Sequence, residues 1–380
     1  MNRSVIVFGH DHTNTLGVIQ SLGRVGYYCI GLLFGVKTSL VSCSRYTKEI
    51  ITAPTPQECI DRLIQHKTSG SNRIPIIPCC DIAALILENN KRRLGESFVF
   101  EYSAYYSLAE LFCKENQVRL ASDAGFNVPK SWHFDLSCKL PDDLTYPCLI
   151  KPLVSCEGAK SDIRVCNSES ELVRNLNTLK YTKQVLLQQY IERDYEISIL
   201  GCGLTNGHTL IPAVENKLTL YPKYVGLECL TNVQKLEDQD IIENIKVLIS
   251  KIGYVGLFSV EMMHCKQDDK FYFTEINLRN DGAEALITKF GANLPLNHVE
   301  DLLGLYITPQ REYHPGYYIW DMHHFLSLIH CDISFITWIK EIKKSKGFML
   351  YFKEDKKPFY KQYSNWLLSK LHLRKDEFYK

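Results

Sequence analysis

The stretch FYFTEINLR, residues 271–279, decides how the chain is interpreted. The apolar run VGLFSVE, residues 255–261, precedes it, and the polar segment HCKQDDK, residues 264–270, separates the two. Runs rich in aromatic and β-branched residues on either side of a short polar segment predict two antiparallel strands. Side chains two residues apart in a strand point to the same face, so Glu275 and Asn277 are expected to share one.

This predicted hairpin places two carboxylates next to each other. If the strands pair in register, Glu261 stands beside Glu275 across the hairpin. Two carboxylates and the Asn277 amide oxygen are hard oxygen ligands, and they suit Mg²⁺, which usually brings substrate phosphates with it. Arg279 adds a guanidinium fork for a phosphate or a carboxylate. The alternative is an ordinary hairpin with polar residues on its solvent-exposed face, because short motifs also occur by chance.

The composition narrows the class of protein. A chain of 380 residues has room for two or three domains. Lys plus Arg number 44 and Asp plus Glu 43, so the net charge of +1 gives no basic excess for binding nucleic acid. We find no Cys-x-x-Cys pair among the 14 cysteines, no apolar leader and no apolar run long enough to span a membrane. Many thiols without an export signal favour a cytoplasmic protein.

The first hundred residues follow a β-α-β pattern. Such an opening predicts a parallel sheet whose loops at the carboxyl edge bind ligands. The first loop, HDHTNT at 10–15, lacks Gly-x-Gly-x-x-Gly, so no dinucleotide site is predicted. The expected elements are strands at 4–8, 27–33, 73–78 and 98–100, with a helix from residue 16 and another at 82–89.

Two lysines are candidates for binding an anion. Lys151 ends the apolar run PCLIKP, residues 147–152, and a lysine in such a strand is costly unless it meets an anion. The loop after it contains Gly158 and Lys160, and its small residues can bring backbone N–H groups onto phosphate oxygens. The loop is not a Walker A sequence, and an edge-strand lysine with its stem along the surface is the alternative. Lys114 falls in the first turns of a helix expected over 108–124.

The middle of the chain contains a strand, a charge and an irregular segment. The strand VLLQQYI, residues 185–191, is followed by the run 195–200, in which Glu196 is the one embedded charge. Residues 188–191 are expected to suit a planar base held between strand backbones. We expect 211–226 to be an irregular lid or substrate loop. Residues 240–252 are predicted to form an amphipathic helix.

These motifs together, in this order and spacing, resemble the ATP-grasp superfamily. The closest branch is the carbamoyl-phosphate-synthase-like and biotin-carboxylase-like one, including single-chain carboxylate–amine ligases. The resemblance extends to about residue 305 and implies a mixed α/β and α+β fold. Its parts are a Rossmann-like pre-ATP-grasp domain over 1–107, a two-lobed ATP-grasp domain over 108–312 with its small lobe at about 145–192, and a C-terminal helical extension over 313–380.

The resemblance also implies a role for each candidate residue. Two positions depart from the usual family pattern: Gln188 stands where Glu is frequent, and the phosphate loop has one glycine. The implied roles are phosphate binding by Lys114 and Lys151 under a loop with Gly158 and Lys160, an adenine hinge of Gln188, Gln189, Tyr190 and Ile191 with Glu196 near the ribose, Mg²⁺ binding by Glu261, Glu275 and Asn277, and catalysis by Arg279 and Lys151.

The implied function is an ATP-dependent carboxylate–amine ligase that forms an amide through an acyl phosphate. ATP and Mg²⁺ are the expected cofactors, with two ions and with Mn²⁺ as a substitute. The expected partners are a small-molecule carboxylate, an amine and a second copy of the chain in a homodimer, and neither nucleic acid nor a membrane span is expected. The alternatives are an enzyme that phosphorylates bicarbonate and a nucleotide-binding regulatory protein without turnover.

Overall fold

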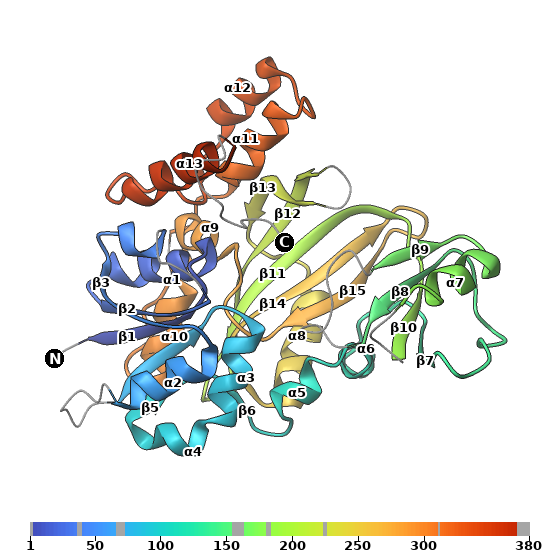
Figure 1. Ribbon diagram of the computed structural model, residues 1–380, viewed down its shortest axis with the longest axis horizontal. Helices are drawn as coiled ribbons and strands as arrows, with labels where there is room; N and C mark the ends of the chain where they lie inside the picture. Colours follow the sequence, from blue (N-terminus) through green and yellow to red (C-terminus); the bar gives the residue numbers. More distant parts are fainter. Residues whose placement is uncertain are drawn as a thin grey trace.

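The computed structural model of the chain contains three β-sheets and a group of C-terminal helices (Figure 1). It describes residues 3–35, 40–65, 73–153, 163–179, 184–222, 226–310 and 312–370. The described part is a mixed α/β and α+β structure, as the sequence predicted. A five-stranded sheet, a four-stranded sheet and an eight-stranded sheet succeed one another along the chain, except that one short strand of the third sheet precedes the second sheet.

The first sheet is parallel and begins the chain. Its strand order is β3-β2-β1-β4-β5. Its central strands are apolar throughout because helices and neighbouring sheets cover both faces. The β-α-β prediction is confirmed. The elements are β1 (Ser4–Gly9), α1 (Thr13–Gly23), β2 (Tyr28–Phe34), η1 (Val41–Cys43), β3 (Thr47–Ala53), α2 (Pro56–Gln65), β4 (Ile74–Pro78), α3 (Asp81–Asn89), α4 (Lys91–Leu94), η2 (Gly95–Ser97) and β5 (Phe98–Val99).

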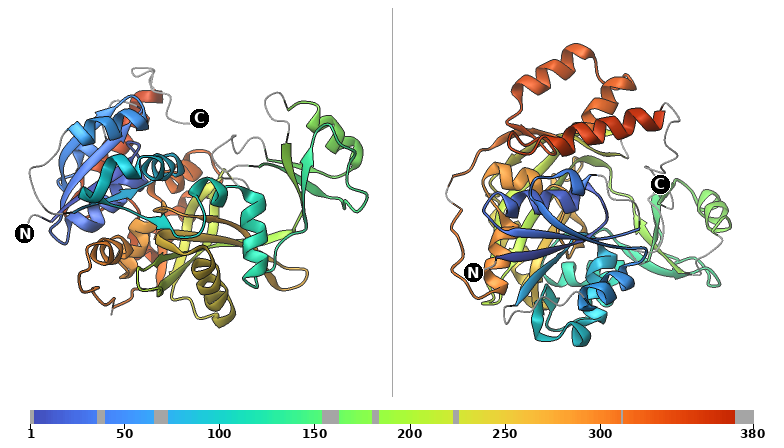
Figure 2. Two further views of the ribbon diagram at one scale, coloured as in Figure 1. Left: turned by 90° about the horizontal axis from the view of Figure 1, so that it is seen from below. Right: turned by 60° about the vertical axis from the view of Figure 1, so that its left-hand side comes forward.

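The second sheet is small and antiparallel, and it stands away from the other two (Figure 2). Its strand order is β7-β10-β8-β9, and its first strand lies before residue 145, where we expected the small lobe to begin. The Ser168 side chain accepts a hydrogen bond from the backbone N of Glu171 at 3.3 Å and caps α7, as the sequence indicated. The elements are β7 (Ser131–Asp135), β8 (Cys148–Pro152), β9 (Arg164–Cys166), α7 (Glu169–Leu176) and β10 (Gln184–Gln189).

The third sheet is the largest of the three, and we call it the floor sheet. Its strand order is β15-β14-β11-β12-β13-β16-β17, and β6 pairs with β14 beside this path. Helix α8 packs on one face and ends at Gly253, whose φ of 61° is the left-handed conformation that glycine tolerates best. The elements are β6 (Tyr102–Ser103), β11 (Arg193–Gly203), β12 (Thr209–Tyr221), β13 (Leu227–Gln234), α8 (Gln239–Ile252), β14 (Tyr254–Cys265), β15 (Lys270–Asn277), β16 (Gly316–Ile319) and β17 (Gly347–Phe348).

The segment 211–226 is not the irregular loop that we expected, because β12 occupies most of it. The middle of this strand is buried on both faces, at Ala213, Val214, Glu215 and Lys217, so its sequence does not alternate there between apolar and polar residues. Val214 packs into the core under α8, whereas Glu215 and Lys217 are buried on the opposite face. Charged residues are usually exposed, so Glu215 and Lys217 led to the prediction of a surface loop.

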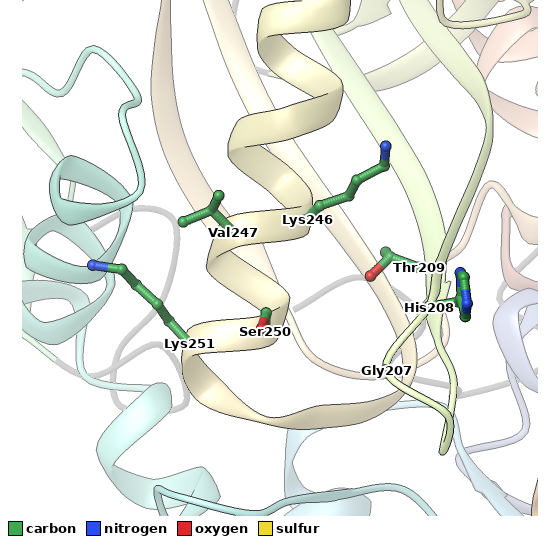
Figure 3. A pocket seen from close by; sticks show the side chains of 7 residues that line it. All are labelled: Gly207, His208, Thr209, Lys246, Val247, Ser250 and Lys251. Atoms are coloured by element: carbon green, nitrogen blue, oxygen red, sulfur yellow. The ribbon is translucent and has the colours of Figure 1, made fainter.

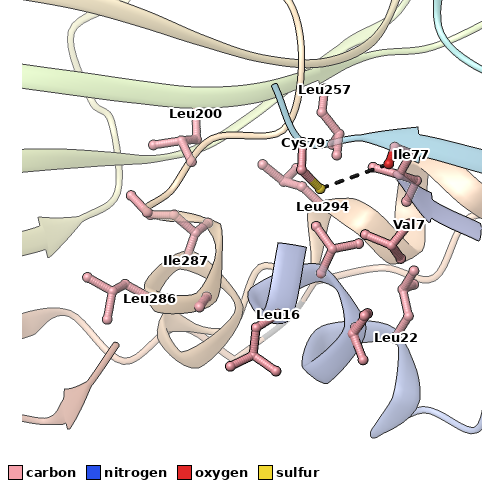
Figure 4. Close-up of a cluster of buried hydrophobic side chains, with 14 of the residues drawn as sticks. Val7, Leu16, Leu22, Ile77, Cys79, Leu200, Leu257, Leu286, Ile287 and Leu294 are labelled. Atoms are coloured by element: carbon pink, nitrogen blue, oxygen red, sulfur yellow. Dashed lines mark hydrogen bonds between the residues drawn. The ribbon is translucent and has the colours of Figure 1, made fainter. Parts of the chain in front are cut away.

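The first and third sheets share one hydrophobic core (Figure 4). Leu16 of α1 and Ile77 of β4 belong to the same buried cluster as Leu200 of β11 and Leu257 of β14. Two helices that follow β15 belong to the cluster as well, namely α9 (Glu284–Phe290) and α10 (Leu294–Leu302). The parallel sheet is therefore packed firmly against the floor sheet.

The prediction of a single helix over 108–124 is wrong, because two helices occupy this range. They are α5 (Leu108–Leu111) and α6 (Lys114–Asp123). A capping box of Ser107 and Glu110 begins α5. The backbone N of Lys114 donates to the carbonyl oxygen of Leu153 at 2.9 Å, so a new helix begins there. The Gln117 side chain of α6 bonds both backbone groups of Ile276 in β15, at 3.0 and 3.3 Å.

The C-terminal part is helical, as predicted, and covers the end of the floor sheet near β13 (Figure 1). It consists of α11 (Asp321–Ile329), α12 (Phe335–Lys344) and α13 (Lys357–Lys370). Within the described ranges, no helix has the length and apolar character needed to cross a membrane.

Candidate active site

The hairpin of β14 and β15 has the register that the sequence predicted. Glu261 is the direct partner of Glu275, and Ser259 is the direct partner of Asn277. The register shifts only after Glu261, toward the turn. The two carboxylates and the amide therefore stand on one face of the floor sheet, opposite the face that α8 covers.

Cations surround this pair of carboxylates. The Nζ of Lys217 lies 2.9 Å from Oε2 of Glu261, and the Nζ of Lys114 lies 3.8 Å from Oε2 of Glu275. Burial raises the pKa of Glu261 to about 7, and the charge of Glu275 adds to this rise although Lys217 opposes it. Two carboxylates held this close favour a bound cation.

The donor set fits a hard metal ion that also has a substrate ligand. Glu261, Glu275 and Asn277 supply carboxylate and amide oxygens, which Mg²⁺ prefers. Over the ranges that the structure describes, no three His, Cys, Asp or Glu side chains are placed to hold a metal alone. This incomplete set matches Mg²⁺ sites in which substrate phosphates and waters complete the coordination.

Arg279 is held by carboxylates from two parts of the chain. Its Nε donates to Oδ1 of Asp81 at 3.1 Å, and its Nη1 lies 3.5 Å from Oδ2 of Asp281. Its Nη2 donates to Oδ1 of Asn277 at 3.0 Å. Burial by itself would lower the pKa of Arg279, but Asp81, Asp281 and Glu275 together raise it. The guanidinium is thus a fixed positive charge beside the candidate metal ligands.

Lys151 is the buried lysine of the small sheet. Its side chain is on β8, the residue is 7 % exposed, and its Nζ donates to Oε1 of Gln188 at 2.6 Å. The Gln188 amide in turn donates to the Ser131 hydroxyl at 2.9 Å. Burial and the charge of Lys114 together lower the pKa of Lys151 to about 8, and the charge of Glu275 opposes this change.

The predicted adenine hinge lies where β10 ends. The backbone N of Gln189 donates to Lys130 and that of Tyr190 to Pro147, at 2.8 and 3.1 Å. Tyr190 is 37 % exposed and Ile191 is 8 % exposed. Glu196 forms an ion pair with Arg193. Gly158 and Lys160 lie outside the described residues.

Sequence reasoning missed several charged residues that the fold brings to this face. Besides bonding Glu261, the Nζ of Lys217 lies 2.9 Å from Oε1 of Glu228 on β13. Asp81 is the first residue of α3, just after strand β4 of the first sheet, and lies about two hundred positions before its partner Arg279. A signal existed for Lys217, since it lies two residues after Glu215, and such spacing puts both on one face of a strand.

A separate surface pocket of about 420 Å³ lies between α8 and the turn that joins β11 to β12 (Figure 3). Its walls include His208, Lys246 and Lys251. The Nζ of Lys246 pairs with Oε1 of Glu243 at 2.6 Å. Because α8 covers the face opposite Glu261 and Glu275, this pocket is separate from the candidate active site.

Comparison with known proteins identifies the central domain. Residues 119–286 match the family model of the ATP-grasp domain. The chain carries an ATP-grasp domain. The resemblance seen in the sequence is therefore confirmed, and the matched ATP-grasp residues include Lys151, Glu261, Glu275, Asn277 and Arg279.

Curated relatives and a solved structure agree with this assignment. A "formate-dependent phosphoribosylglycinamide formyltransferase" of Bacillus subtilis (strain 168) is 28 % identical over 180 residues, 45 % of either chain. A "D-aspartate ligase" of Enterococcus faecium (strain Aus0004) is 22 % identical over 277 residues, 64 % of this chain and 62 % of the relative. The chain spans about half the length of the curated relatives it matches.

The solved structure is an "N5-carboxyaminoimidazole synthetase from Staphylococcus aureus". Its TM-score is 0.67 at 16 % identity, with 88 % of this chain and 86 % of that chain covered. At this identity the likeness establishes the fold of the ATP-grasp chain and does not extend to its substrate.

Proposed function

We propose that this ATP-grasp protein is a carboxylate–amine ligase that forms an amide through an acyl phosphate. The observation that carries the proposal is the in-register pair of Glu261 and Glu275, with Arg279 two positions beyond Asn277 and with lysines facing the carboxylates. A protein that only bound a nucleotide would have no need for this set of metal ligands.

Each part of the site has a distinct task in the proposed reaction. Lys114 and Lys151 bind the phosphates of ATP, and Glu261, Glu275 and Asn277 hold Mg²⁺. The metal ion offsets negative charge on the transferred phosphoryl group, which is the main requirement of such a transfer. Arg279 orients the carboxylate of the acid substrate and stabilises the acyl phosphate.

The bonds change in two steps. A carboxylate oxygen of the acid forms a bond to the γ-phosphorus, the bond to the bridging oxygen breaks, and ADP leaves. The amine nitrogen then attacks the carbonyl carbon, the C–O bond to phosphate breaks, and the nitrogen proton leaves with the phosphate. The products are an amide, ADP and phosphate.

The name of the D-aspartate ligase supports an amino acid as one substrate and an amine acceptor as the other. Two ions, replacement by Mn²⁺, a homodimer and a cytoplasmic location are further parts of the proposal and rest on the resemblance. A bicarbonate-phosphorylating enzyme is the second candidate, because the same lysines and metal ligands would serve the phosphorylation of bicarbonate.

Trapping the acyl phosphate tests the proposal directly. Purified protein, Mg-ATP and hydroxylamine are incubated with pools of amino acids and small carboxylates, and hydroxamate and ADP are measured. We expect a hydroxamate from at least one acid in equal amount to the ADP formed. ADP formation that depends on bicarbonate alone would support the second candidate, and no ADP in any pool would contradict both.

A further inference from the structure

A second group of polar side chains lies beside the candidate metal ligands on the same face of the floor sheet. We call it the β12–β13 cluster, and it consists of Glu215, Lys217, Glu228, Thr231 and Trp320. Lys217 contacts Glu228 at 2.9 Å, and the Trp320 indole N–H donates to Oε1 of Glu215 at 3.0 Å. All five residues are at most 9 % exposed. None of the roles proposed above for the metal ligands and Arg279 involves this cluster.

The cluster has a surplus of negative charge. Lys217 lies 2.9 Å from both Glu228 and Glu261, and Glu215 is two residues before it on the same face of β12. If Glu261 serves the metal ion, one lysine remains for two glutamates. Burial and the charge of Glu228 together raise the pKa of Glu215 to about 8. A bound cation at the cluster would pair with the second of these two carboxylates.

A buried hydroxyl independently indicates a missing ligand. Thr231 is the direct partner of Lys217 across β12 and β13, so both side chains are on the same face. Its Oγ1 is fully buried and has no hydrogen-bond partner among the residues that the structure describes. Buried hydroxyl groups are nearly always paired, so an unpaired one aimed at the cluster is a place for a polar ligand group.

The cluster adjoins the place where the acyl phosphate would form. Lys217 links it to Glu261 at 2.9 Å. Trp320 lies against the turn after Arg279, since a Cβ atom on Gly282 would be 3.4 Å from its ring. A ligand bound here would have Arg279 and Asp281 on one side and the metal ligand Glu261 on the other.

We propose that the β12–β13 cluster is the acceptor subsite and binds the ammonium group of a primary amine. This inference rests on the proposed ligase function. The second oxygens of Glu228 and Glu215 would accept from the ammonium, and Thr231 would bond a neighbouring polar group. Because Trp320 lies in the C-terminal extension, that extension would form one wall of the subsite.

The chemistry of the second step then balances. The ammonium gives one proton to the Glu228 carboxylate, and the free lone pair on nitrogen forms the C–N bond. The C–O bond to phosphate breaks with its electron pair, and the remaining proton from nitrogen leaves as part of hydrogen phosphate. No oxidant or further reactant is required.

The test separates the two chemical steps in the full chain. Hydroxylamine is small and needs no ammonium subsite, so hydroxamate formation reports the first step alone. Glycinamide, L-lysine and 1,4-diaminobutane are the amine probes, and amide product reports both steps. The variants are Glu228→Gln, Glu215→Gln and Thr231→Val, with Glu243→Gln on the exposed surface of α8 as the matched control.

We expect Glu228→Gln and Glu215→Gln to form hydroxamate within about twofold of the wild-type rate. Their KM for the amine should rise about tenfold or more, because each loses a charged hydrogen-bond partner of the ammonium. Glu228→Gln also loses the group that takes the ammonium proton, so its kcat for amide formation should fall as well. Thr231→Val should have a smaller effect, and Glu243→Gln none. Unchanged KM values, or hydroxamate formation without amide from any probe, would overturn the subsite. Absence of hydroxamate in the wild type would instead overturn the ligase function, and the subsite with it.

Discussion

Lys151 in the small sheet and Lys217 in the floor sheet are both buried, yet their surroundings are opposite. The first donates to the neutral amide of Gln188, and burial lowers its pKa to about 8. The second lies between Glu228 and Glu261, and these carboxylates raise its pKa well above the usual value despite burial. Lys151 is thus a buried cation that donates to a neutral group, whereas Lys217 is the counter-ion of two carboxylates.

This difference indicates which lysine is free to bind phosphate. A charge without a carboxylate partner in a buried strand gains most from an arriving anion. Lys217 already has its anions and holds the carboxylates of the floor sheet together. Four predictions test this division, in order of decreasing effect.

The largest effect is expected on stability. In the folded state the raised pKa of Lys217 keeps it charged, so its contribution is present throughout neutral pH and is lost only as pH rises through the folded value. Lys217→Met would leave buried carboxylates unpaired and should cost about 3 kcal/mol, the low end for buried pairs because Glu261 is partly exposed. Lys151→Met should not destabilise. Denaturant unfolding of both variants measures the difference, and equal losses would refute the comparison.

Glu275→Gln should remove turnover while the fold persists. Loss of even an indirect partner of a metal ion typically costs 10–100-fold, so we expect more than about 100-fold for a direct ligand. Hydroxamate formation and circular dichroism measure the two parts. Normal activity in this variant would show that Glu275 does not hold the metal ion.

The pH dependence of nucleotide affinity should report Lys151. With a pKa of about 8 in the free protein, it is charged below pH 8 and neutral above. ATP phosphates favour the charged form, so affinity should fall by up to about tenfold per pH unit above pH 8. Calorimetric titration with ATP between pH 7 and 9 measures this. The slope should vanish in Lys151→Met and persist in Lys139→Met, whose exposed lysine pairs with Asp142 on the same lobe.

Gln188→Glu should have the smallest effect. A carboxylate at this position would accept the same hydrogen bond from Lys151 and raise its pKa. The decline in ATP affinity should therefore begin about one pH unit higher, with little change at pH 7. An unchanged profile would mean that Gln188 does not control the charge of Lys151.

The sequence allowed the hairpin to be predicted because its information is local. Glu261 and Glu275 are close in the chain, and a period of two fixes their shared face. The partners of Lys217 could not be predicted in this way, since Glu228 and Glu261 reach it through strand pairings and β12 looked irregular. Asp81 reaches Arg279 only because the parallel sheet packs on the floor sheet. Such contacts depend on tertiary packing and leave no local pattern.

Helix α6 is attached to both lobes of the ATP-grasp domain. Its first backbone N–H is bonded to the residue after β8, and Gln117 one turn later is bonded to β15. In mechanical terms, the first turn of α6 is a pivot that connects the two sheets. If the small sheet moves relative to the floor sheet when a nucleotide binds, we expect the Lys114 side chain, which lies 3.8 Å from Glu275, to move least. Lys114 would then keep its position beside Glu275 whether the two sheets are apart or closed on a nucleotide.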